Sequence, residues 1–283
     1  MNIAVLADIH ANLPALQTVA DDVERWRPDA VIVAGDLVNR GPRSRECLDF
    51  VMEKVRTAGW LLLRGNHEDY VLSHADPATP RSGLGLEIRR LSYWTYQQVC
   101  NDLDLLQAMP LEQKLHDPQG GEVHFVHGSL LGLRDGIYPE TLDCELPAKT
   151  GLDRRPPGAP PLALFCVGHT HRPLVRRLNG TLIVNAGSVG LPFDQDTRLA
   201  YARLSWQPSG WQAEIVRLKY DLEGAKRDFT ATGYLQGGGP LARLVLIELE
   251  TASSHLYNWS VRYQSAAERG EISMEDSVQR YLA

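Results

Sequence analysis

Residues 1–10 read MNIAVLADIH, and this stretch introduces the pattern that decides the fold. The apolar run Asn2–Ala7 has the length and composition of a buried strand, and polar residues follow it at once. Apolar residues then recur at helical spacing over 16–26, and Asn12 is suitably placed to cap that helix. A second apolar run, Ala30–Ala34, starts the same order of strand, polar loop and helix again. We therefore expect an α/β protein.

Three polar residues stand directly after predicted strands, namely Asp8, Asp36 and Asn66. They are 28 and 30 residues apart, which is close to the length of one βαβ unit. In such sheets, ligands bind beyond the carboxyl ends of the strands. We therefore expect these three side chains to converge on one edge of the sheet.

The rest of the chain divides into segments of different pattern. Residues 69–115 are expected to form a helical insertion, and residues 147–161, with five prolines, a surface loop. The tail after Pro240 has a helical pattern. We predict a core domain of residues 1–220 and a helical appendage, residues 221–283, packed on it. Further strands are expected at 123–126, 162–167, 175–178, 182–184, 199–206 and 212–218.

Length and composition exclude several classes of protein. A chain of 283 residues can bury a full core without a disulfide or a structural metal. Hydrophobic residues make up 43% and charged residues 23%, which excludes fibrous and disordered classes. The formal net charge of −6 disfavours nonspecific binding to nucleic acid or to an anionic membrane, because both need a basic surface.

The cysteines and the apolar runs bear on the compartment. Cys47, Cys100, Cys144 and Cys166 are far apart and form no CxxC pair, so neither a zinc knuckle nor a disulfide framework is expected. The first residues lack the basic segment of a signal peptide, and no apolar run approaches the roughly 20 residues of a membrane span. We therefore expect a cytoplasmic protein that binds no membrane.

Five of the nine histidines fall in small polar clusters after predicted strands. Two clusters place their ligands two residues apart, and in an extended segment such pairs point the same way. Together the clusters offer seven nitrogen and oxygen ligands, too many for one tetrahedral zinc and suitable for two ions that share a carboxylate. The candidate metal ligands are Asp8, His10, Asp36, Asn66, His127, His169 and His171, with Asp36 as the bridge.

Each cluster taken alone has a simpler explanation. A single Asp-x-His is usually a solvated turn, and Gly-Asp or Gly-Asn after a strand is ordinary turn chemistry. Five such segments, each at the end of a strand, are hard to attribute to five independent turns. We therefore interpret them as one metal centre.

The five segments resemble, in order, the signature blocks of the calcineurin-like metallophosphoesterase superfamily. A further segment, Asn185–Gly190, resembles a glycine-rich block of its bacterial phosphodiesterase branch. The blocks are Asp8-Ile9-His10, Gly35-Asp36, Gly65-Asn66-His67-Glu68, His127-Gly128 and Gly168-His169-Thr170-His171.

The resemblance implies a four-layer α/β/β/α sandwich of two mixed sheets flanked by helices, with the metallophosphoesterase catalytic domain in residues 1–220. It implies a first ion on Asp8, His10, Asp36 and His171, and a second ion on Asp36, Asn66, His127 and His169. In this family His67 lies beside the oxygen of the leaving group and is not a ligand. Glu68 would support the ligands, although an acid in the first turn of a helix has the same favourable position.

The implied activity is hydrolysis of a phosphodiester or phosphomonoester. Two divalent ions lower the pKa of a shared water and supply hydroxide near neutral pH, so no protein nucleophile is needed. A cationic or proton-donating imidazole at His67, with a pKa near neutrality, would stabilise the departing alkoxide. We expect Mn²⁺ first, while Fe, Zn, Co and Ni also suit these ligands.

Arg40 is a further candidate for the catalytic site, since a guanidinium suits phosphate. The blocks around Arg40 and Arg64 resemble those of serine/threonine phosphatases and diadenosine tetraphosphatases. In those families an acid usually stands at the position of Asn39, and a glycine at that of Ala11.

Two alternatives to the leading function stay open at this point. The arginine-bearing blocks allow a serine/threonine protein phosphatase or a dinucleoside polyphosphate hydrolase. A binding scaffold without catalysis is the alternative of another class, although such a scaffold should lack ligands that this chain has. The expected partner is a phosphorylated small-molecule or nucleotide substrate, and a homo-oligomer is compatible with the sequence.

Overall fold

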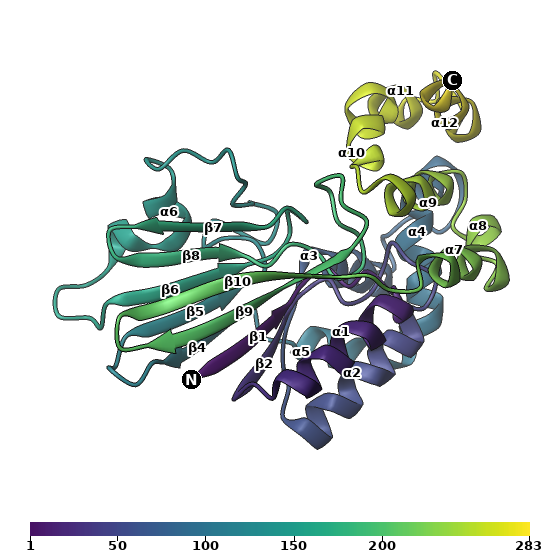
Figure 1. Cartoon of the computed structure of the whole chain (residues 1–283). Coiled ribbons are helices and arrows are strands. Elements are labelled where there is room, and N and C mark those ends of the chain that lie inside the picture. Colours follow the sequence, from purple (N-terminus) through teal and green to yellow (C-terminus); the bar gives the residue numbers. More distant parts are fainter.

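Two five-stranded mixed sheets form the core of the fold, with apolar inner strands such as Asn2–Leu6 buried on both faces and partly exposed strands at the edges. The computed structural model describes all 283 residues, and Figure 1 shows the two sheets packed face to face. The first sheet has the order β10-β9-β1-β2-β3, in which β1, β2 and β3 are parallel and β9 and β10 are antiparallel to their neighbours. Its strands are β1 (Asn2–Leu6), β2 (Ala30–Ala34), β3 (Leu61–Leu63), β9 (Leu199–Gln207) and β10 (Gly210–Leu218).

The second sheet has the order β4-β5-β6-β8-β7, and only its two outer pairs are antiparallel. Its side chains interdigitate with those of the first sheet in a core that contains Val5, Phe125, Leu164 and Trp211. Its strands are β4 (Glu112–His116), β5 (Glu122–Val126), β6 (Leu162–Val167), β7 (Leu174–Leu178) and β8 (Thr181–Asn185).

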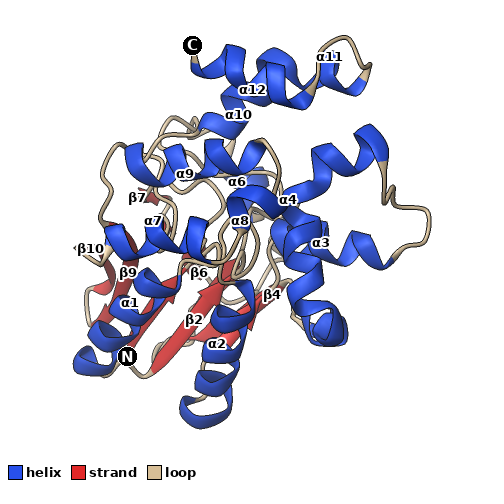
Figure 2. Cartoon of the chain, turned by 90° about the vertical axis from the view of Figure 1, so that its right-hand side faces the viewer, coloured by secondary structure: helices blue, strands red, loops and turns tan.

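Helices α1 (Leu13–Trp26) and α2 (Ser44–Ala58) cover the outer face of the first sheet, as Figure 2 shows. Their buried stripes, with Leu16 and Leu48, pack on Ala4 and Val33 of the strands. Asn12 caps α1, because its side-chain oxygen accepts a hydrogen bond from Ala15 N at 3.2 Å. The outer face of the second sheet carries only a thin layer, formed by α6 (Leu146–Thr150) and the chain around it.

The expected four-layer sandwich is confirmed, with two local differences. The helical segment expected over 69–115 stops early: it contains α4 (Gly83–Val99) and α5 (Leu103–Ala108), but residues 112–116 form edge strand β4. In β4, exposed and half-buried residues alternate, so this strand lacks the apolar run that marks the inner strands. The proline-rich segment 147–161 is not all loop, because Pro147 occupies the first turn of α6, where its missing N–H costs nothing.

The C-terminal region is helical, and it lies beyond the strand ends in Figure 1. Its core also contains Leu91 of α4 and Leu191, so these helices pack on the remainder of the chain. The division into residues 1–220 and 221–283 stays a prediction. No helix in the structure is both long and apolar enough to span a membrane. The C-terminal helices are α7 (Leu222–Ala231), α8 (Tyr234–Gly237), α9 (Leu241–Thr251), α10 (His255–Trp259), α11 (Ser265–Glu268) and α12 (Met274–Leu282).

Candidate metal centre

The seven candidate ligands lie together at one edge of the two sheets. They follow the carboxyl ends of β1, β2, β5 and β6, and Asn66 is the first residue of α3 (Asn66–Leu72), after β3. Because strands of both sheets end at this edge, residues 161 positions apart in the sequence become neighbours: His169 N donates to Asp8 Oδ2 at 2.8 Å. As expected from the sequence, Asp8, Asp36 and Asn66 lie together at this edge.

Backbone strain is concentrated at this edge. Eight of the twelve non-glycine residues with positive φ belong to the segments 8–11, 36–40 and 169–171. Each such residue costs of the order of 1–3 kcal/mol, and the surrounding structure must supply that free energy. Strain that recurs in three loops of one site is typical of a functional centre.

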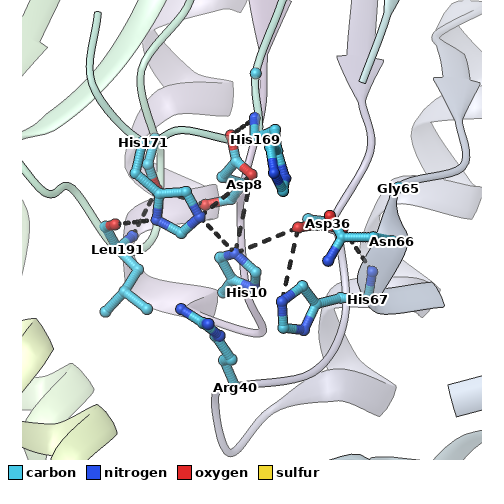
Figure 3. A network of polar contacts seen from close by, with 12 residues as sticks. Asp8, His10, Asp36, Arg40, Gly65, Asn66, His67, His169, His171 and Leu191 are labelled. Atoms are coloured by element: carbon cyan, nitrogen blue, oxygen red, sulfur yellow. Dashed lines mark hydrogen bonds and ion pairs between the residues drawn. The ribbon is translucent and has the colours of Figure 1, made fainter. Parts of the chain in front are cut away.

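Asp8, His10, Asp36 and His171 form a first group of metal-binding atoms, all buried and within 4.8 Å of one another (Figure 3). The Nε2 atoms of His10 and His171 are 3.1 Å apart. Asp36 Oδ2 lies 3.7 Å from His10 Nε2, and Asp8 Oδ1 lies 3.4 Å from His171 Nε2.

Asp36, His127 and His169 form a second group within the same limit of 4.8 Å. Asn66 joins it, because its Oδ1 lies 3.0 Å from His127 Nε2, while Asp36 Oδ2 lies 3.3 Å from the same nitrogen. Asp36 therefore belongs to both groups, which is the position of a bridging carboxylate.

Each of the four histidines is oriented by one backbone carbonyl. A carbonyl oxygen can only accept, so the ring nitrogen beside it carries a proton and the other nitrogen is the one that can bind a metal once it is unprotonated. The pairs are His10 Nδ1 with Asn39 O (3.3 Å), His127 Nδ1 with Ala34 O (2.8 Å), His169 Nε2 with Arg134 O (3.2 Å) and His171 Nδ1 with Leu191 O (2.5 Å).

The free atoms of the first group fit a cation. His10 and His171 direct unprotonated Nε2 atoms at each other, and burial holds the pKa of both rings well below the usual range. The buried Asp8 Oδ1 beside them has no hydrogen-bond donor. Acceptors that face one another without a proton between them are the donor set of a metal ion.

Charge is distributed unevenly over the second group. Burial would raise the pKa of Asp36, but the nearby His127 and His67 hold that pKa well below the usual range. Burial would lower the pKa of His127, but the Asp36 carboxylate raises it to about 10. Without metal, His127 therefore supplies the positive charge that balances Asp36.

Glu68 supports the ligands through the backbone. Its carboxylate is completely buried and accepts hydrogen bonds from four backbone N–H groups. Two of them belong to Asp36 (3.0 Å) and Gly65 (2.8 Å), and the others to Leu37 and Val38. Glu68 thus ties the loop after β2 to the loop after β3, a stronger role than an acid that only favours a helix N-terminus.

His67 lies beside both ligand groups, with Nε2 4.0 Å from Asp36 Oδ2. Its Nδ1 is 2.9 Å from Asn39 Nδ2. Because Asn39 Oδ1 already accepts from Arg40 N at 2.8 Å, the amide of Asn39 donates to His67, and the ring carries its proton on Nε2, toward the centre.

Of the two forms expected for His67, cationic and proton-donating, burial favours the neutral proton donor in the metal-free site, with a pKa below the neutral range that was expected. Burial lowers the pKa of His67 to about 3, so the ring is neutral near pH 7. The sequence could not show this burial. It did show the relevant departure, because a carboxylate in place of Asn39 would accept a proton from Nδ1 and favour the cation.

Arg40 extends toward His10 from the loop after β2, and its side chain is 20% exposed (Figure 3). Its guanidinium lies 3.7 Å from Glu248 Oε2 and 6.0 Å above the ring of Phe193. Arg64 is directed elsewhere: it lies 3.3 Å from Asp69 and donates to Gln107 O, which ties β3 to its neighbours.

An open cavity of about 670 Å³ lies over the ligands. Sequence reasoning missed several residues of its wall, including Tyr70, Arg134 and Phe193. None of them stands in a motif. The guanidinium of Arg134 lies 4.8 Å from the ring centre of Tyr70, and Phe193 stacks on His171 at 4.3 Å.

Comparison with known proteins gives independent evidence about the family of this chain. The model of a family described as calcineurin-like phosphoesterase matches residues 1–177. An uncharacterised protein of Methanocaldococcus jannaschii is 28% identical over 243 residues, which cover 79% of this chain and 89% of that protein.

Two solved structures are similar over most of their length. A metallophosphoesterase from Sphaerobacter thermophilus has a TM-score of 0.67 and 25% identity, over 89% of this chain and 100% of that chain. A hypothetical protein from Pyrococcus horikoshii OT3 has a TM-score of 0.73 and 17% identity, over 89% of this chain and 99% of that chain. At 17% identity, the similarity to the Pyrococcus horikoshii protein shows a shared fold only.

Proposed function

The chain belongs to the calcineurin-like phosphoesterase family, and from this premise we propose that it hydrolyses a phosphodiester or phosphomonoester at a centre of two divalent metal ions. The observation that carries the proposal is the position of Asp36 in both groups of metal-binding atoms. The first ion would be held by Asp8, His10, Asp36 and His171. The second would be held by Asp36, Asn66, His127 and His169.

The chemistry follows from these ligands and their neighbours. When bound, two ions polarise the phosphoryl oxygens and provide hydroxide at neutral pH for in-line attack. His67 presents a neutral Nε2–H to the leaving oxygen, and Arg40 presents its guanidinium to a nonbridging phosphate oxygen. Glu68 keeps the two ligand loops in register through the backbone.

The alternatives are less well supported. A scaffold without catalysis has no need of buried, strained ligands around two cation sites, and all seven ligands and His67 come together here. A protein phosphatase or dinucleoside polyphosphate hydrolase draws its support from Arg40, but Asn39 replaces the acid that those families place beside the histidine.

The metals, the substrate and the compartment are parts of the same proposal. Mixed imidazole, carboxylate and amide ligands suit Mn²⁺, and also Fe, Zn, Co and Ni. The substrate would be a phosphorylated small molecule or nucleotide. All four cysteines are free, two of them exposed, which favours the cytoplasm.

The test combines metal content with turnover. The chelated protein should not cleave bis(4-nitrophenyl) phosphate or 4-nitrophenyl phosphate, and Mn²⁺ should restore cleavage of at least one with two ions bound per chain. Asp36→Asn should lose more metal and more activity than His10→Ala, because Asp36 serves both ions. His124→Gln is the control, since His124 contacts Glu112 away from the centre. Full activity without metal would overturn the proposal.

A further inference from the structure

A second cavity, of about 820 Å³, lies beside the metal centre. One side of it comes from the segment of α3 and α4, with Ser73, Ile88 and Ser92. The other side comes from the C-terminal helices, with Leu241 of α9 and Trp259 of α10. The two sides are held together because α8 and α11 pack against α4. None of the candidate metal ligands lines this cavity.

The second cavity is continuous with the cavity over the ligands, since the two have residues of their walls in common. The shared residues are Arg40, His67, Tyr70, Arg134 and Tyr257. His67 therefore stands at the junction, with Nε2 toward Asp36 and with the ring of Tyr70 edge-on at 5.1 Å. A group that passes His67 away from the metal centre enters the second cavity.

The geometry of in-line displacement indicates which part of the substrate would enter the second cavity. Attack and departure occur on opposite sides of phosphorus, so the leaving oxygen lies on the side of the group that stabilises it. With His67 in that role, the alcohol that leaves is directed into the second cavity.

The wall of the second cavity shows what kind of alcohol fits. Ile88, Leu241 and Trp259 are apolar or aromatic, whereas the hydroxyl of Ser260, which donates to Tyr257 O, can still accept a hydrogen bond from a ligand. This combination suits a planar ring that carries hydroxyl groups.

The charges of the wall are balanced. Three guanidinium groups, from Arg40, Arg89 and Arg134, face three carboxylates, from Asp69, Asp76 and Glu268. A polyphosphate would need an excess of positive charge, so the balance favours a neutral occupant.

We propose that the second cavity is the site of the leaving group, and that the substrate is the phosphoester of a large neutral alcohol with a planar ring and hydroxyl groups. This inference rests on the proposed function for its chemistry. The cavity itself requires no metal, so the alcohol should bind to the metal-free protein.

Two adjacent residues provide a matched pair of variants. Ser260 lines the cavity, whereas Val261 is 68% exposed and does not. Ser260→Trp places a ring in the space that the alcohol would occupy, and Val261→Trp adds the same ring on the outside.

The probe is 4-methylumbelliferone, a planar phenol that is neutral at about pH 6, titrated at that pH into metal-free protein by calorimetry. We expect binding to the unchanged protein and to Val261→Trp with equal Kd, and a Kd at least about 10-fold higher for Ser260→Trp. No binding to the unchanged protein, or equal Kd values for all three, would overturn the assignment.

Turnover of two methyl phosphodiesters by the Mn²⁺-loaded protein is the second readout. One ester releases 4-methylumbelliferone and the other 4-nitrophenol, which is smaller. Ser260→Trp should raise KM at least several-fold more for the larger leaving group, and equal changes would overturn the assignment. If the unchanged protein cleaves neither diester, the corresponding phosphomonoesters take their place in the same comparison. Failure on all four esters would contradict the proposed function, while the calorimetric comparison still decides the cavity.

Discussion

Arg40 Nη1 lies 3.7 Å from Oε2 of Glu248, and the carboxylate of Glu248 is completely buried. Arg40 belongs to the loop after β2, whereas Glu248 belongs to α9, more than two hundred residues later. Glu248 Oε1 accepts a hydrogen bond from Leu256 N at 2.7 Å, and Oε2 has no hydrogen-bond partner. The C-terminal helices therefore supply the counter-charge that orients an arginine of the candidate site.

Glu248→Gln should lower kcat/KM without removing metal. This substitution removes the charged partner that orients Arg40, so we expect kcat/KM to fall about 10-fold. That fall corresponds to roughly 1.4 kcal/mol, which is the range of one charge-assisted contact. Arg40→Ala removes the phosphate contact itself and should lose at least as much, and the double variant should lose little more than Arg40→Ala, because Glu248 acts through Arg40.

The control for this prediction is Glu250→Gln, which changes a carboxylate of the same helix that pairs with Lys226 instead. Additive losses in the double variant would show that Glu248 does not act through Arg40.

Gly65→Ala should empty the metal centre. A Cβ atom at this position would lie 2.2 Å from Asp36 Oδ1, so this carboxylate, which belongs to both groups of metal-binding atoms, would have to move. We expect elemental analysis to show the loss of both ions. Gly59→Ala is the control, because its Cβ meets open space at a positive φ of 66°. It should cost about 1 kcal/mol of stability and leave the metal content intact.

His67→Ala should keep both ions and slow the release of poor leaving groups. Removing one preorganised donor costs roughly 10²- to 10³-fold in kcat. The loss should be smaller for a nitrophenyl ester, because nitrophenolate departs with little assistance. Loss of an ion would make His67 a ligand, and equal losses for both esters would indicate that it positions the substrate.

Asn39→Asp should convert His67 from a neutral donor to a cation. The unchanged ring, with a pKa of about 3, is neutral throughout the range of pH 5 to 9. A carboxylate beside Nδ1 would raise this pKa, so the ring would be charged below the new pKa and would lose its proton as pH rises through it.

The measurement for Asn39→Asp is nitrogen NMR of the imidazole against pH, together with the pH profile of kcat. Asn179→Asp, in the turn between β7 and β8, is the control. An unchanged titration of His67 in Asn39→Asp would contradict the tautomer assigned here.

Metal binding should release protons. With its pKa of about 10, His127 is protonated at pH 7 in the metal-free protein, whereas a metal binds only the neutral ring. At least about one proton should therefore leave per chain, and metal affinity should rise with pH up to about 10. Calorimetry in two buffers of different ionisation enthalpy measures this number. An affinity independent of pH between 6 and 9 would contradict it.

The sequence alone indicated the buried strands and the residues of the candidate centre, and the family resemblance that those residues carry supplied the layers of the fold. Strands such as Asn2–Leu6 and Leu162–Val167 are buried on both faces, so their apolar runs are continuous and can be recognised in the sequence. The ligands could be found because each stands within a few residues of such a run. Edge strand β4 was missed, since an exposed strand with alternating polar residues lacks that signal.

Only the tertiary structure decided what depends on distant segments or on burial. The approach of Glu248 to Arg40, the second cavity and its junction at His67 join parts of the chain that no local pattern relates. The sequence left open whether His67 is a cation or a neutral proton donor for the same reason, because a pKa depends on the surroundings of the ring. Residue types and their spacing determine which ligands can meet, whereas packing determines their protonation and the groups that a substrate encounters beyond them.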